Sequence, residues 1–111
     1  MIFVFGPLYS GKRAAAAKLL GCDESALAAR CVFDAQELAR ERSDLETLAD
    51  ELAHCDAVIA AEVGSGIVPV DREEREARER AGRLNILLAE RASAVVRVFC
   101  GIPLVIKGEL P

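Results

Sequence analysis

Hydrophobic and polar positions along this 111-residue chain follow two periods, one typical of buried strands and one typical of helices. Short apolar runs rich in β-branched and aromatic residues predict four strands, at 1–5, 31–34, 56–64 and 94–100. Between the strands, apolar residues recur every three or four positions, which predicts helices. The alternating order is typical of a parallel α/β sheet with helices on both faces.

The first half of the chain contains three helical segments. Ala14–Leu20 is rich in good helix formers and should stop at Gly21, while residues 23–29 predict one or two helical turns. Ser43–Glu46 resembles a capping box, which would open an amphipathic helix reaching about His54. Residues 35–42 form either a separate helical turn or part of a bent helix.

A long helix is predicted in the second half, from Asp71 to about Ala92, with an apolar stripe at Ala77, Ala81, Leu84, Leu88 and Ala92. Its first half is densely charged. That half is either a solvated face with pairs four residues apart, or a face that turns Arg75 or Arg78 toward a phosphate or a neighbouring subunit. Residues 101–103 should break the last strand, leaving 104–107 as a short edge segment.

The segment Gly6–Arg13 follows the first strand and fits the phosphate-loop pattern G-x-x-x-x-G-K-[ST] except at its last position. Glycines free to take unusual backbone angles let such a loop curl around a phosphate, and the helix N-terminus adds positive potential. The pattern predicts a nucleotide site for ATP or GTP. Its binding residues would be Gly6, Tyr9, Ser10, Gly11, Lys12 and Arg13. The alternative is a glycine turn with a surface lysine.

Two carboxylates end predicted strands, at the sheet edge where ligands bind in open α/β folds. Asp34 is a candidate for Mg²⁺, directly or through water, or else caps the following helix. Glu62 is the second candidate. The predicted catalytic set is Lys12, Asp34 and Glu62, with both carboxylates near the metal. Arg13 replaces the hydroxyl that usually holds Mg²⁺ and cannot ligate a metal, so the Mg²⁺ site should be weakened.

The histidine and cysteines suggest little further chemistry. His54, the one histidine, is either a proton shuttle or phospho-acceptor, or an exposed residue at a helix end, and the second interpretation is favoured. The four cysteines contain no CxxC pair, so they are expected to be reduced and mostly small buried hydrophobes.

Composition narrows the class of protein. With 52% hydrophobic and 29% charged residues, the chain should build one domain, 1–111. A parallel sheet in so small a domain suggests a homo-oligomer. A net charge of −4 without a basic patch argues against nucleic acid. No apolar run could span a membrane and no signal peptide is evident, so a cytoplasmic location is expected.

Glu62–Pro69, the helix positions Arg75, Arg78 and Gly82–Asn85, and Gly101–Leu104 together resemble the adenosylcobinamide kinase/adenosylcobinamide-phosphate guanylyltransferase family. The resemblance implies a RecA-like P-loop fold with three layers and a small, mainly parallel sheet, often assembled as a trimer. It implies a role in cobalamin biosynthesis, in which the enzyme phosphorylates the aminopropanol arm of the corrinoid adenosylcobinamide and then transfers GMP through a histidine.

The chain departs from the family pattern in several places. Arg13 stands for Ser or Thr, Ala61 for Asn, Ile86 for Gln and Glu79 for Asp. The segment before Asp34 is much shorter than in the family and lacks the histidine nucleophile, which His54 does not replace. We therefore expect nucleotide binding without guanylyl transfer by the family mechanism.

Three functions stay open on this basis. The first is a shortened kinase. The second is a nucleotide- or corrinoid-binding module that has lost catalysis. The third is an assembly domain that uses the charged helix 71–83.

Overall fold

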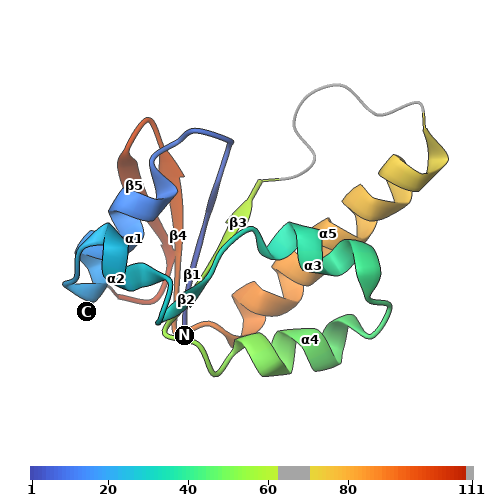
Figure 1. Cartoon of the computed structure of the whole chain (residues 1–111), viewed down its shortest axis with the longest axis horizontal. Coiled ribbons are helices and arrows are strands. Elements are labelled where there is room, and N and C mark those ends of the chain that lie inside the picture. The colour runs from blue at the N-terminus through green and yellow to red at the C-terminus, as the bar shows by residue number, and fades with distance from the viewer. Residues whose placement is uncertain (63–70, 110–111) are drawn as a thin grey trace.

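The computed structural model describes residues 1–62 and 71–109, which form a sheet between two layers of helices (Figure 1). The strand order is β2-β3-β1-β4-β5. The strands are β1 Ile2–Gly6, β2 Cys31–Val32, β3 Ala57–Ala61, β4 Ala94–Phe99 and β5 Ile102–Lys107. The first four pair in parallel and β5 pairs antiparallel with β4. The predicted mainly parallel α/β sheet is confirmed.

Helices cover the two faces of the sheet unequally. α1 and α2 pack on one face, and α3, α4 and α5 on the other (Figure 1). The helices are α1 Lys12–Leu20, α2 Glu24–Leu27, α3 Ala35–Glu41, α4 Leu45–Leu52 and α5 Arg72–Arg91. This three-layer arrangement leaves the carboxyl ends of β1, β2 and β3 at one edge of the sheet.

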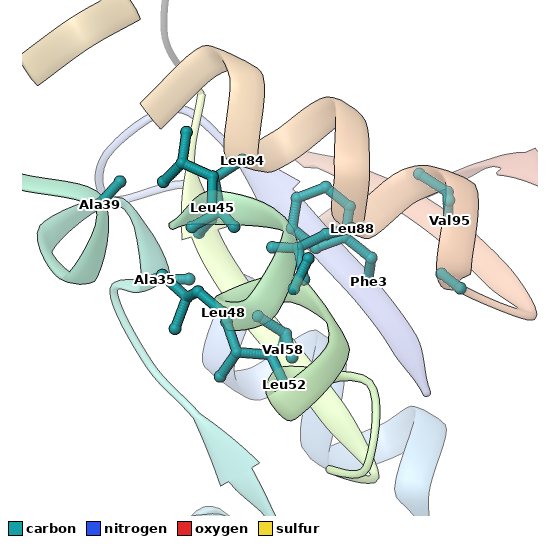
Figure 2. Packing of buried hydrophobic residues seen from close by; sticks show 13 residues of the cluster. Phe3, Ala35, Ala39, Leu45, Leu48, Leu52, Val58, Leu84, Leu88 and Val95 are labelled. Carbon is teal, nitrogen blue, oxygen red and sulfur yellow. The ribbon is translucent and has the colours of Figure 1, made fainter. Parts of the chain in front are cut away.

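Alternation along the strands divides the core in two. In β1, Ile2 and Val4 face α1, while Phe3 packs with the helices of the other face. Figure 2 shows Phe3 beside Leu88 of α5, and Leu45 of α4 near Leu84, all in one cluster. Such two-sided burial explains why the central strands are continuous apolar runs rather than alternating ones.

Helix ends follow the predicted signals in most places. Gly21 ends α1 in a left-handed conformation, with φ 67°. Asp71 caps α5 by accepting from the Glu73 N–H at 2.9 Å. The predicted apolar stripe of α5 is buried along its whole length. α3 is a separate helix from α4, which settles the alternative left open for residues 35–42.

The capping-box prediction is wrong. α4 begins after Asp44, whose side chain makes no cap hydrogen bond. Instead, the Asp44 carboxylate accepts from the Arg42 guanidinium at 2.7 Å. The predicted box had Ser43 as its cap, one residue before the observed N-cap, Asp44. The pairing with Arg42 lowers the pKa of Asp44.

Two strand predictions also need correction. β2 ends at Val32, so Asp34 lies beyond the strand and not at its last position. The predicted break at 101–103 is a tight turn, because Cys100 and Gly101 both have positive φ, at 53° and 74°. Two such residues make the hairpin turn that joins antiparallel strands. Pro103 therefore lies inside β5, an edge strand, where a missing N–H is tolerated.

The hairpin of β4 and β5 carries an uncovered apolar surface. Every residue of β5 is exposed. Ile102, Leu104 and Ile106 are more than half exposed, as is Phe99 on β4. We call these four residues the hairpin face. The predicted loop 65–69, together with the strand end at 63–64, lies outside the described residues.

Candidate functional site

The glycine loop joins the central strand β1 to α1, and its two glycines serve different purposes. A Cβ on Gly6 would lie 2.2 Å from the Val98 carbonyl oxygen, so only glycine fits against β4 there. Gly6 is not among the described glycines with positive φ, so its predicted conformational freedom is not used. Gly11 does adopt the left-handed conformation, with φ 86°. Gly6 thus seats the loop against the sheet, and Gly11 turns it into the helix.

Lys12 is folded over the loop. Its Nζ donates to the carbonyl oxygens of Pro7 at 2.7 Å and Gly6 at 3.3 Å. Burial lowers its pKa, partly opposed by the negative charge of Asp34. The ammonium is held by neutral carbonyl groups, so its charge is available to an incoming anion.

The loop also holds a buried hydroxyl. Ser10 is 5% exposed, and within the described residues its Oγ has no hydrogen-bond partner. The Ser10 carbonyl accepts from the Gly101 N–H at 2.7 Å, which fastens the loop to the turn of the hairpin. Tyr9, a predicted binding residue, instead extends fully into solvent from a left-handed position, with φ 58°.

The first turn of α1 directly follows the loop. The Ala15 N–H makes the first bond of the helix, to the Gly11 carbonyl at 3.0 Å. The amides of Lys12, Arg13 and Ala14 precede it and have no partner inside the helix. No acidic residue lies in this turn. The N-terminus of α1 is therefore a positive end suited to an anion.

Arg13 and Asp34 meet beside the loop. Arg13 Nη2 lies 3.7 Å from Asp34 Oδ2, and the two side chains are 60% and 57% exposed. The guanidinium lies over the Phe33 ring, 4.4 Å from its centroid. Asp34 has the N-cap position of α3, but with φ 53° it makes no side-chain cap bond. The capping alternative is therefore not realised by the side chain. A pair this open and long contributes little to stability.

Glu62 and Arg97 form a much tighter pair. The carboxylate accepts two bonds from the guanidinium, at 2.7 and 2.9 Å, and the Glu62 side chain is only 20% exposed. The Glu62 N–H donates to the Gly6 carbonyl at 2.7 Å, which places the residue against the loop. Hydrogen bonding to Arg97 lowers the pKa of Glu62, and the same contact raises the pKa of Arg97.

The structure thus brings together the predicted residues Lys12, Arg13, Asp34 and Glu62. Arg13 faces Asp34, and the Gly6 carbonyl accepts from both Lys12 and the Glu62 N–H. It adds Arg97, which the sequence analysis missed. The available signal was a single charged residue inside the apolar run of β4. Phe33, which stacks on Arg13, was also missed.

The donors present do not fit a magnesium ion. Mg²⁺ at a phosphate loop needs oxygen ligands, including a hydroxyl after the lysine. Here Arg13 has that position, and arginines pair with both candidate carboxylates, Asp34 and Glu62. Across 1–62 and 71–109, no group of three or more His, Cys, Asp or Glu side chains could hold a metal.

The other predicted candidates lie elsewhere. His54 is exposed and precedes β3, at the opposite edge of the sheet from the loop, as the favoured interpretation expected. Among the cysteines only Cys31 is buried and Cys100 is exposed, so the expectation that they are mostly buried is wrong.

Several charged side chains at the start of α5 form ion pairs or hydrogen bonds with α3 or within α5 itself. Glu74 forms a two-bond pair with Arg40 of α3, at 2.7 and 2.8 Å. Arg80 donates to the carbonyl of Ala39 at 2.9 Å. The expected pairing four residues apart occurs between Arg72 and Glu76, at 3.2 Å. Much of this charged half therefore joins α5 to α3, and Arg75 is exposed.

A strand, a glycine loop and a helix at the centre of a mostly parallel sheet define a P-loop-type α/β domain. Residues 22–106 match the family described as cobinamide kinase / cobinamide phosphate guanyltransferase, and the chain belongs to that family. The matched region contains Asp34, Glu62 and Arg97 but begins after the loop. The assignment of the loop therefore rests on its own residues and geometry.

A curated relative is the "bifunctional adenosylcobalamin biosynthesis protein CobP" of Pseudomonas aeruginosa, 34% identical over 76 residues. The alignment covers 68% of this chain and 44% of the relative, so the chain spans less than half the length of that protein. In the described residues, no helix is long and apolar enough to cross a membrane.

Proposed function

We propose that this chain binds the phosphate groups of ATP or GTP at Gly6–Arg13 and acts as an adenosylcobinamide kinase-like protein in cobalamin biosynthesis. The observation that carries the proposal is the position of Lys12, whose ammonium donates to two loop carbonyls and forms no ion pair with a carboxylate of residues 1–62 or 71–109. The unpartnered hydroxyl of Ser10 and the positive end of α1 support it.

In the proposed transfer, a hydroxyl oxygen of the acceptor attacks the terminal phosphorus of the nucleotide. The bond from that phosphorus to the bridging oxygen breaks, and the nucleoside diphosphate leaves. Lys12 and the amides of α1 hold the phosphate charge. Asp34, the more exposed carboxylate, takes the hydroxyl proton, because both oxygens of Glu62 already accept from Arg97, which lowers the affinity of Glu62 for a proton.

A groove beside Glu62 is the proposed place for the acceptor. Its volume is about 390 Å³, and it lies between α5 and the sheet, lined mainly by apolar side chains including Phe5, Ile86 and Ile106. At its polar end, Asn85 Oδ1 is buried without a partner among the described residues. The groove thus offers an apolar wall and an acceptor oxygen to a corrinoid side arm.

Guanylyl transfer through a histidine is not part of this proposal. His54 is the one histidine of the sequence. It lies at the opposite edge of the sheet, beyond the end of α4.

Isothermal titration with ATP and with GTP tests nucleotide binding, using Lys12→Ala beside the matched control Lys18→Ala. Lys18 lies on the same helix but is exposed in its last turn. We expect Lys12→Ala to weaken binding on the order of a hundredfold, since it removes a partly buried counter-charge, and Lys18→Ala to leave it unchanged. Equal affinity of the two variants, or no binding by the wild type, would reject the phosphate-loop assignment.

A binding module without catalysis is the second candidate. Two features favour it: Arg13 replaces the hydroxyl that usually holds Mg²⁺, and both oxygens of Glu62 already accept from Arg97. An assay of labelled phosphate transfer to adenosylcobinamide separates the two candidates. Transfer above the Lys12→Ala background supports the kinase, and tight nucleotide binding without transfer supports the module.

Self-association is proposed through the hairpin face rather than the charged half of α5. Four large apolar residues lie open on one sheet edge, whereas Glu74 and Arg80 in the charged half of α5 are bonded to α3. Exposed apolar edge strands readily pair with another chain. Light scattering should show a homo-oligomer that Leu104→Lys converts to a monomer. A monomeric wild type would refute the proposal.

A further inference from the structure

Each part of the expected metal site at the loop is replaced or paired by an arginine. The position after Lys12 carries Arg13 instead of a hydroxyl. Asp34 faces Arg13, and both oxygens of Glu62 accept from Arg97. These side chains therefore do not form a magnesium site, and the arginines bring positive charge to the loop in its place.

Arg13 is placed to contact a bound phosphate. It lies in the first turn of α1, next to the lysine that covers the loop. Stacking on Phe33 holds the guanidinium plane beside the loop, 4.4 Å from the ring centroid. Its closest carboxylate oxygen, on Asp34, is 3.7 Å away, beyond ordinary hydrogen-bond length. The five N–H donors of the guanidinium are therefore not committed to Asp34.

Arg97 is not equivalent to Arg13. Its two bonds to Glu62, at 2.7 and 2.9 Å, hold it on the sheet. Of the two arginines, only Arg13 is both close to the loop and loosely paired. It therefore has the freedom to exchange Asp34 for a phosphate.

We propose that Arg13 is a built-in counter-charge for the nucleotide phosphates, so that binding at this loop does not require a divalent cation. This inference rests on the proposed function. A guanidinium fork matches phosphate oxygens in a two-bond geometry and is always charged. Independently, the loop contains the buried Ser10 hydroxyl, which has no hydrogen-bond partner among the described residues.

As a consequence, Mg²⁺ should affect ATP binding in the opposite direction from a phosphate loop that carries the usual hydroxyl. Free ATP carries more negative charge than its magnesium complex, and the metal would compete with Arg13 for the same oxygens. Mg²⁺ should therefore weaken binding to the wild type. Arg13→Ser restores the hydroxyl of the usual pattern, so this variant should bind poorly without metal and better with it.

The test is isothermal titration of the full chain with ATP, once with EDTA and once with excess Mg²⁺. It compares the wild type, Arg13→Ser, Arg13→Lys and the control Arg30→Ser. Arg30 is an exposed arginine paired with Asp56 before β3, away from the loop. In EDTA we expect Arg13→Ser to lose about tenfold in affinity, Arg13→Lys to lose less, and Arg30→Ser to match the wild type. Thermal unfolding of each variant confirms that it is folded.

The possible outcomes distinguish failure of the Arg13 inference from failure of the proposed nucleotide binding. Wild-type binding in EDTA at least as tight as with Mg²⁺, together with the Arg13→Ser loss, supports the inference. Wild-type binding only with Mg²⁺ overturns it and leaves nucleotide binding standing. Binding that Arg13→Ser does not change in EDTA also overturns it. Absence of ATP binding under both conditions overturns the proposed function and this inference with it.

Discussion

Two arginine–carboxylate pairs flank the same loop, and they differ in nearly every physical respect. Arg97 and Glu62 meet through two short bonds, with the carboxylate 20% exposed. Arg13 and Asp34 face each other at 3.7 Å in open solvent. The first pair is a fixed part of the sheet edge, while the second can change partner. Proximity of opposite charges therefore does not by itself reveal whether a pair supports the fold or is available to a ligand.

The largest effect should come from breaking the tight pair. Glu62→Ala leaves the Arg97 guanidinium without its two acceptors, and it also removes negative charge near Lys12. We expect the melting temperature to fall by several degrees, measured by calorimetry. The matched variant Asp34→Asn, which tolerates the same left-handed backbone, should leave it almost unchanged. Equal losses in the two variants would show that the pairs do not differ as described.

Low pH should also remove the stability that the Glu62–Arg97 pair contributes, without any mutation. Pairing lowers the pKa of Glu62 below its ordinary value of 4.5, so the folded state binds a proton less readily than the unfolded chain. This contribution to stability is complete above pH 4.5 and is lost as the pH falls through the lowered folded-state pKa. The stability gap between the wild type and Glu62→Gln should therefore close on acidification.

Thermal unfolding of both proteins from neutral pH down to pH about 3 measures this gap. Other paired carboxylates, Asp44 and Glu74, also have a lowered pKa and destabilise both proteins alike. Only the difference between the two curves reports Glu62. A gap that stays constant across this range would mean that ionisation of Glu62 contributes nothing.

A smaller effect is expected from Arg97→Lys. Lysine keeps the charge but cannot offer the two parallel donors that Glu62 now accepts, and it loses the contact of Arg97 with the Phe99 ring. The fall in melting temperature should be about half that of Glu62→Ala. The corresponding change at the open pair, Arg13→Lys, should not alter it. A larger loss at Arg13 than at Arg97 would reverse the comparison.

The smallest effect should be a gain. Asp34 adopts φ 53° and makes no side-chain cap bond, so glycine can replace it without losing a contact inside the fold. Asp34→Gly should stabilise the protein by about 0.5 kcal/mol, or roughly two to four degrees. Asp34→Asn, which tolerates the same conformation, is the control and should change little. A destabilised Asp34→Gly variant would show that the carboxylate supports the fold after all.

The sequence predicts the local features of this site better than the ion pairs between residues far apart in the chain. Gly11 and Lys12 follow from a strand-loop-helix pattern within thirteen residues. The Glu62–Arg97 pair joins residues 35 positions apart, and it depends on β1 lying between β3 and β4. No local period encodes that strand order. The same limit explains why Arg97 was not predicted as a site residue.

The errors in the fold prediction have comparable causes. Pro103 is a strand breaker only in the middle of a sheet, and its place at the edge could not be known before the strand order was known. Ser43 was expected to cap α4, but the helix begins after Asp44, whose oxygens pair with Arg42. In each case a neighbour in space or sequence outweighed a local preference.

The hydrogen bond from the Gly101 amide to the Ser10 carbonyl links the loop to a surface turn. The exchange rate of the Gly101 amide proton therefore reports on the loop, although Gly101 itself lies in the turn. Its exchange with deuterium requires the loop and the turn to separate, so its protection measures how often the loop opens. A ligand that orders the loop should slow this exchange without touching Gly101. Hydrogen exchange at the hairpin turn thus measures how often the loop opens.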